Sequence, residues 1–90
     1  MKTFLQPSKS ESAKSFYKKA YVERFGDTDL LTSYNTEVAS YNIAKDQMIV
    51  NGYYSQTTAR HINSFLEKWN YPRMSKKEIE DQEGKAIEKK

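Results

Sequence analysis

The side chains best suited to chemistry lie together in one stretch, residues 52–69, which reads GYYSQTTARHINSFLEKW. It holds the only histidine of the chain, His61, among hydroxyl side chains and one arginine. A histidine within hydrogen-bond reach of Ser55 or Thr58 could act as a general base on a hydroxyl nucleophile. A lone histidine beside an apolar helix stripe more often packs against the core and makes one hydrogen bond. We therefore interpret His61 as a partly buried packing residue.

The same stretch could bind an anion or a partner surface. A helix that begins at Ser55 or Thr57 has unpaired N–H groups and a dipole that favour anions at its start. Arg60 could pair with a phosphate through two hydrogen bonds, and Tyr53 could stack on a base or pack on a protein. Alternatively, the hydroxyl groups only cap the helix and Tyr54 joins the core. The candidate binding residues of this corner are Tyr53, Thr57 and Arg60.

The sequence contains none of the common catalytic or metal-binding motifs. There is no cysteine, no HExxH motif, no phosphate-binding glycine loop and no GxSxG motif. Asp27 and Asp29 could share one face of an extended segment, as metal ligands or an acid pair would. Isolated carboxylates after a helix end usually cap or solvate it, so we keep these two only as candidate binding residues. The sequence predicts a protein that is not an enzyme and has no metal site and no cofactor.

Charge is unevenly distributed along the chain, which has a net charge of +3. Residues 1–25 carry six Lys or Arg against two Glu (+4), and residues 26–54 carry one Lys against four acids (−3). Residues 55–90 carry eight Lys or Arg against six acids (+2). Basic side chains such as Lys18 and Lys19 could contact a nucleic-acid backbone, whereas the acidic middle could mimic phosphates towards a basic channel. The pattern leaves both kinds of partner open.

The first part of the chain is predicted to be a helix. Ser8 and Glu11 have the spacing of a capping box, so the helix should begin near Lys9. Apolar residues then recur at helical spacing, and Gly26 is a suitable C-terminal stop. These apolar residues are Ala13, Phe16, Tyr17, Ala20, Tyr21 and Phe25.

The middle of the chain has the composition of β-strands, with β-branched, aromatic and aliphatic residues in approximate alternation. The predicted strands cover residues 30–34, 37–43 and 48–54, with a hairpin loop at 44–47. Asn35 marks a bend or bulge, so the first two segments are also compatible with one kinked strand. Asn51 and Gly52 indicate a bulge or bend before the next helix.

The second half of the chain predicts two helices. The first begins at Ser55 or Thr57 and carries one apolar stripe that should pack on the sheet. The stripe consists of Ala59, Ile62, Phe65, Leu66 and Trp69. Ser75 and Glu78 repeat the capping-box spacing, so a short helix should cover residues 76–82, with Ile79 as its main apolar anchor. Residues 84–90 should be disordered.

Together these elements predict an α+β fold with an N-terminal helix, a small antiparallel sheet of two or three strands, a central helix packed on the sheet, and a short C-terminal helix or disordered tail. We expect residues 1–7 to be flexible, residues 8–72 to form one domain, and residues 73–90 to form a charged, weakly helical or disordered tail. No apolar run approaches the roughly 20 residues that span a bilayer, and no signal-peptide pattern is present. We therefore expect a cytoplasmic protein.

Two segments carry a motif, SYNTEVA at residues 33–39 and YSQTTARHINSFL at residues 54–66. They resemble an uncharacterised family of small proteins from phages and mobile elements of low-GC Gram-positive bacteria. In that family an SYNT-x-VA strand precedes a glycine turn and a YS-x-TT-x-RHI-x-x-FL helix. The resemblance covers roughly residues 30–66. It implies an origin in a bacterial host cell and assigns no role to any residue.

An origin of this kind implies a protein that binds host machinery. We expect a non-catalytic protein that modulates a host macromolecule, most sharply an anti-CRISPR-like inhibitor of a bacterial defence nuclease. The seven tyrosines favour a protein interface, where this residue is enriched. The alternative is a small nucleic-acid-binding accessory or regulatory protein of a phage or plasmid, in which Lys18, Lys19 and Arg60 contact the backbone. Monomer and dimer both remain open, since the edges of a small sheet invite pairing.

Overall fold

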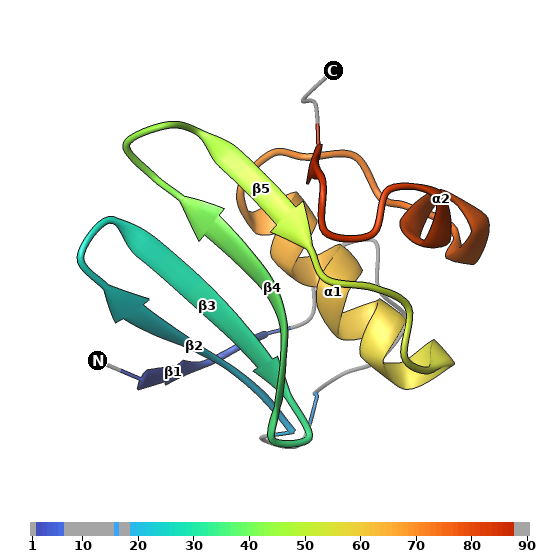
Figure 1. Cartoon of the computed structure of the whole chain (residues 1–90). Coiled ribbons are helices and arrows are strands. Elements are labelled where there is room, and N and C mark those ends of the chain that lie inside the picture. Colours follow the sequence, from blue (N-terminus) through green and yellow to red (C-terminus); the bar gives the residue numbers. More distant parts are fainter. Residues whose placement is uncertain (1, 7–15, 17–18, 88–90) are drawn as a thin grey trace.

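A single antiparallel sheet forms the framework of the protein. The computed structural model describes residues 2–6, 16 and 19–87, and each of its strands pairs with its neighbour in the sequence. The strands are β1 (Lys2–Phe4), β2 (Ala20–Phe25), β3 (Thr28–Ser33), β4 (Thr36–Asn42), β5 (Gln47–Val50) and β6 (Ala86–Ile87). The helices are α1 (Gln56–Lys68) and α2 (Lys76–Asp81). Figure 1 shows α1 lying against one face of the sheet, with α2 on the side away from β1.

The predicted N-terminal helix is wrong wherever the structure describes that segment. Ala20–Phe25 forms β2, which pairs with β1 on one side and β3 on the other. Ala20 and Val22 are buried while Tyr21 between them is partly exposed, which is the two-residue period of a strand. The apolar spacing of this segment also fitted a helix, but backbone pairing along both edges outweighs that local pattern. The predicted helix start near Lys9 lies outside the described residues.

The sheet is also larger than the two or three strands predicted. It has six strands, because β1, β2 and β6 join the three predicted ones. β2 lies in the segment predicted as a helix, and β1 and β6 lie in the predicted flexible N-terminus and tail. β1 has three residues and β6 has two, which is too short for a recognisable sequence pattern. Both strands satisfy backbone groups at the edges of β2 and β5. Within the described residues, neither helix is long and apolar enough to cross a membrane.

Tight turns join the central strands. Gly26, with φ 60°, lies in the turn between β2 and β3, where glycine adopts a positive φ without steric cost. Tyr34 (φ 49°) and Asn35 (φ 69°) both have positive φ, as the central residues of a type I′ turn do. Asn35 therefore reverses the chain between β3 and β4 and does not merely bend it. The loop between β4 and β5 covers residues 43–46, close to the predicted 44–47.

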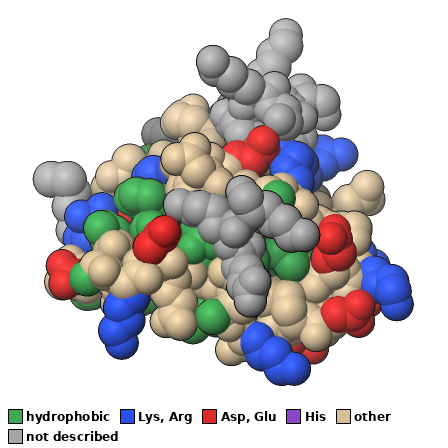
Figure 2. Space-filling view, turned by 90° about the horizontal axis from the view of Figure 1, so that it is seen from above, with side chains coloured by type: hydrophobic (Ala, Val, Ile, Leu, Met, Phe, Trp, Pro, Cys, Tyr) green, Lys and Arg blue, Asp and Glu red, His purple; other side chains and the backbone are tan. Residues whose placement is uncertain are grey.

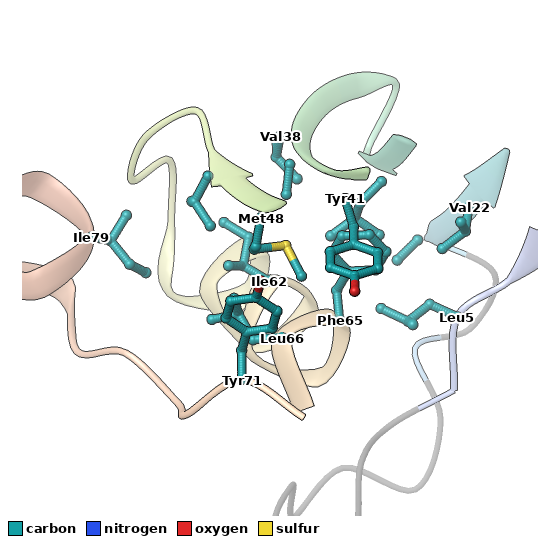
Figure 3. Close-up of a cluster of buried hydrophobic side chains, with 14 of the residues drawn as sticks. Leu5, Val22, Val38, Tyr41, Met48, Ile62, Phe65, Leu66, Tyr71 and Ile79 are labelled. Carbon is teal, nitrogen blue, oxygen red and sulfur yellow. The ribbon is translucent and has the colours of Figure 1, made fainter. Parts of the chain in front are cut away.

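The core lies between α1 and the inner face of the sheet. One row of buried side chains crosses the four central strands, and we refer to it as the inner row. It consists of Val22, Leu31, Ala39 and Val50. Ile62, Phe65 and Leu66 of α1 are fully buried on this side of the sheet (Figure 3). Trp69 at the C-terminal end of α1 is partly buried against the same core. Burial of these apolar side chains is the main favourable term in folding.

The short helix α2 joins this core through one side chain. The predicted capping box is present, since Ser75 Oγ accepts from the Glu78 N–H and the Glu78 side chain accepts from the Ser75 N–H. The bond to Ser75 lowers the pKa of Glu78. Ile79 is fully buried, and Figure 3 shows it reaching from α2 towards the core. An isolated helix of this length is marginal in water, so the docking of Ile79 holds it.

Two tyrosines tie the loop between β4 and β5 to the end of α1. Tyr71, which follows α1, donates from its hydroxyl to the carbonyl oxygen of Asp46 at 2.9 Å, and Tyr41 of β4 donates to the Asp46 carboxylate. The ring of Tyr41 stacks on Trp69 with 4.5 Å between ring centroids. The hydrogen bond to Asp46, together with burial, raises the pKa of Tyr41 to about 12.

Replacing Ile79 by alanine tests whether α2 is part of the domain. Because the side chain is fully buried, we expect Ile79→Ala to lower the free energy of unfolding by about 2–5 kcal/mol in a urea titration. The neighbouring Glu80 is exposed, so Glu80→Ala should change it by less than about 0.5 kcal/mol. An Ile79→Ala variant as stable as the wild type would mean that α2 does not dock in solution.

Tyrosine ionisation provides a test of the bond between Tyr41 and Asp46. The ordinary pKa of a tyrosine is about 10, so between pH 10 and about 12 the unfolded chain releases a proton that folded Tyr41 retains. The free energy of unfolding should therefore fall as the pH rises through this window. Absorbance at the tyrosinate band should show a late-titrating fraction that shrinks in Tyr41→Phe but does not vanish, because burial and the nearby Asp46 also raise the pKa of Tyr71. The same late fraction should persist in Tyr54→Phe, which leaves the bond between Tyr41 and Asp46 in place.

Candidate functional site

The start of α1 is capped by Ser55, one of the two caps that the sequence predicted. One of the N–H groups considered for anion binding is therefore already bonded within the protein. Ser55 Oγ accepts from the Thr58 N–H at 3.1 Å. Thr57 and Arg60 are exposed and lie three residues apart, so they share one side of the first turn. Tyr53 is partly buried against the core, and the Lys76 ammonium lies 5.2 Å from its ring centroid. The structure thus brings Thr57 and Arg60 together, while Tyr53 packs on the core.

The other predicted binding residues lie at two opposite ends of β2. The carbonyl oxygen of Lys19, before β2, accepts from the Tyr34 N–H at 3.0 Å, at the turn between β3 and β4. The carbonyl oxygen of Asp27, after β2, accepts from the Ile43 N–H at 2.7 Å, at the loop between β4 and β5. Lys19 and Asp27 therefore cannot belong to one compact site. Lys18 lies outside the described residues.

Asp29 is paired and buried, in contrast to the exposed Asp27. Its carboxylate accepts from both Nε and Nη2 of Arg24, the residue opposite it on β2, and the second contact is 3.2 Å long. Asp29 is 2% exposed, whereas about half of the Arg24 side chain is accessible. The hydrogen bond to Asp29 raises the pKa of Arg24. The carboxylate that we considered as a ligand thus holds a cross-strand ion pair.

The two motif segments meet in a buried polar cluster that the sequence did not predict. Ser33 Oγ lies 3.0 Å from Thr58 Oγ1 and 2.8 Å from His61 Nδ1, and we call these three residues the hydroxyl–histidine cluster. The Phe16 and Tyr34 rings lie against His61, with centroid distances of 4.5 and 5.7 Å. The spacing in SYNT and TT-x-RHI therefore reflects side chains that bond to each other across α1 and β3.

A serine bonded to a histidine is the pairing of a nucleophile with its base. Here Ser33 is 2% exposed and His61 is 1% exposed, so no substrate reaches the Ser33 hydroxyl in this conformation. We expected His61 to be a partly buried packing residue, whereas it is fully buried and its Nδ1 is bonded to Ser33. In the described part of the chain, no group of three or more His, Cys, Asp or Glu side chains could hold a metal ion.

The sheet face opposite α1 is accessible along all six strands, and the sequence did not predict it. Side chains that alternate with the inner row point to this side, and we call it the outer face. Its strand residues are Lys2, Phe4, Tyr21, Glu23, Phe25, Thr28, Leu30, Thr32, Glu37, Ser40, Asn42, Gln47, Ile49 and Ala86. None of them is buried, and Phe25 is 58% exposed.

The chemistry of the outer face is mostly neutral. Lys2 stands against Glu23 and Glu37, which gives a formal charge of −1, and the Lys2 ammonium lies 4.2 Å from the Tyr21 ring centroid. The remaining side chains are aromatic, aliphatic, hydroxyl or amide groups. The alternation in Tyr21, Glu23 and Phe25 was the one sequence signal that could have indicated it.

A serine substitution tests the hydroxyl–histidine cluster. Ser33→Ala leaves the buried Thr58 and His61 groups without this shared partner, so the free energy of unfolding should fall by about 1–3 kcal/mol. Ser40 lies on the outer face of β4 and is partly exposed, so Ser40→Ala is a matched control with an expected change below about 0.5 kcal/mol. Equal stability of the two variants in urea titrations would contradict a structural role for the cluster.

Comparison with known proteins gives a family for this chain. No curated protein sequence and no solved structure matches it. The sequence model of a family of unknown function, DUF8033, matches residues 3–81. That range contains β2 to β5, α1 and α2, together with the hydroxyl–histidine cluster and most of the outer face. This chain is therefore a member of the DUF8033 family of unknown function.

Proposed function

We propose that this protein is a non-catalytic binding module that contacts a protein of a bacterial host or of a mobile element through its outer face. The observation that carries the proposal is an accessible six-stranded face that bears the exposed aromatic side chains Phe4 and Phe25, which are 41% and 58% exposed. Monomeric proteins rarely expose contiguous apolar patches without a use for them. The protein acts in the cytoplasm of the host cell.

The chemistry of the outer face favours a protein partner over a nucleic acid. Protein interfaces are enriched in aromatic residues, and Phe4, Tyr21 and Phe25 lie on this face. A nucleic-acid platform would need several Lys or Arg side chains on one surface, whereas the only cation among the outer-face strand residues is Lys2. On the side seen in Figure 2, acidic and basic side chains are interspersed with hydrophobic ones.

In its sharpest form, the partner is a bacterial defence nuclease and the protein is its inhibitor. The resemblance to phage and mobile-element proteins supports this choice. Mimicry of phosphates by acidic residues does not support it, because Asp29 is paired with Arg24 and Asp46 accepts from two tyrosines. Glu37 and Asp27 lie near opposite ends of the sheet. An inhibitor of this kind would therefore bind through the neutral outer face and not as a copy of a nucleic acid.

Charge substitutions on the outer face test the proposal. Phe25→Lys and, separately, Ile49→Lys should each weaken binding to a captured host protein at least about tenfold, which is about 1.4 kcal/mol, because each places a charge in an apolar contact. Tyr54→Lys introduces the same charge at a 48% exposed position outside the sheet and should bind like the wild type. Calorimetry with the purified partner measures the affinity of each variant, and thermal unfolding checks that each variant is folded.

Three results would oppose the proposal. Lysate of a Gram-positive host could yield no stoichiometric protein partner, or both outer-face variants could bind the partner as the wild type does. A shift of DNA or RNA mobility at low salt that weakens steeply as salt is added would favour the nucleic-acid alternative. Undiminished cleavage by the host's RNA-guided nucleases in the presence of the protein would remove the sharpest form only.

A further inference from the structure

A groove lies between β1 and the C-terminal half of α1, on the side of the molecule away from α2. Its volume is about 520 Å³, within the range of small-molecule sites. Leu5 and Val22 form an apolar wall, and Ser64 and Lys68, four residues apart on α1, lie across from them. A second hollow of about 270 Å³ shares Val22 and Lys68 with the groove and extends it towards Arg24.

The charge along this groove reduces to one lysine. Arg24 and Asp29 neutralise each other in their cross-strand pair. Glu67, which lines the groove, pairs with Arg73 at 2.7 Å. Lys68 lines both hollows, and its contact within the described residues is with the Trp69 ring, whose centroid lies 5.6 Å from the ammonium. Among the described residues that line it, the groove thus presents an apolar wall and one cation outside the two ion pairs, Lys68, where the two hollows meet.

We infer that this groove binds a small amphipathic carboxylate, with its hydrocarbon part along Leu5 and Val22 and its carboxylate at Lys68. The apolar wall excludes an ion without a hydrocarbon part, because a bare anion gains nothing from apolar lining. The charge at Lys68 selects against a cationic head and favours an anionic one over a neutral head. Medium-chain fatty acids have this chemistry, and the site takes them as carboxylate anions from solution.

Decanoate below its micelle-forming concentration is a direct probe. Trp69 is the only tryptophan of the chain and lies beside Lys68, so its fluorescence should change saturably when decanoate binds. Calorimetry should give one site per chain. Decanol should bind at least about tenfold more weakly, and decyltrimethylammonium should not bind, since Lys68 repels its head.

Two substitutions locate the site, each with a matched control. Lys68→Gln should weaken decanoate binding about two- to fivefold, whereas Lys77→Gln, at an exposed lysine of α2, should leave it unchanged. Thr3→Phe should fill the groove and also weaken binding, whereas Thr36→Phe, at an exposed position on β4, should not. The affinities of these variants should be measured by calorimetry and not by Trp69 fluorescence, because Lys68→Gln also changes the environment of Trp69.

Several outcomes would overturn the inference. The first two are that decanoate does not bind saturably, or that it binds no better than decyltrimethylammonium. The other two are that both Lys68→Gln and Thr3→Phe bind decanoate as the wild type does, or that the protein binds only to vesicles that contain the acid. The outer-face variants Phe25→Lys and Ile49→Lys should bind decanoate normally, because neither residue lines the groove. Failure of this inference is therefore distinguishable from failure of the proposed function.

Discussion

One face of α1 lies fully buried against the inner face of the sheet, and the rest of the structure depends on this contact. The helix brings His61 to Ser33 near its start and Trp69 to Tyr41 at its end, so its position aligns polar and aromatic contacts more than ten ångströms apart. It also forms one wall of the groove beside β1. A loss of apolar packing here would therefore loosen both the bond of His61 to Ser33 and the stacking of Trp69 on Tyr41.

The same contact separates the two sides of the sheet. The side under α1 uses its polar groups internally, in the pair of Arg24 with Asp29 and in the hydroxyl–histidine cluster. Buried polar groups of this kind must be satisfied within the protein, and they leave little hydrogen-bonding capacity for a partner. The outer face has no element packed on it among the described residues, and its hydroxyl and amide groups remain accessible. The contact surface and the structural polar groups thus lie on opposite sides.

The sequence predicted the elements whose signals are local. The cap at Ser55, the apolar stripe with Ile62 and Phe65, and the capping box at Ser75 agree with the structure, because each signal involves residues within a few turns of one helix. The strands β3 to β5 were recognisable from their composition. The prediction of a helix at β2 was wrong because Tyr21 and Phe25 fit both the helical and the strand period. Only the pairing of β2 with a strand on each side decides between the two.

Site residues were harder to predict because their roles depend on distant partners. Asp29 was considered as a ligand, but its role follows from Arg24 across the turn. For His61 only the hydroxyls of its own helix start were considered as partners, whereas it bonds to Ser33 of β3. The outer face has no motif, since it arises only when six short strands are placed side by side. No local pattern in Phe25 or Ile49 indicates that they share a surface.

The order of the strands has a consequence for synthesis. Every strand pairs with its sequence neighbour, and the loops that join β2 to β5 contain two to four residues, so these hairpins close at small entropic cost as they leave the ribosome. α1 follows all four of these strands in the chain. Until it emerges, the inner row is exposed to water and to other nascent chains. The four strands can therefore bury their inner row only after the chain has been made through residue 68, where α1 ends.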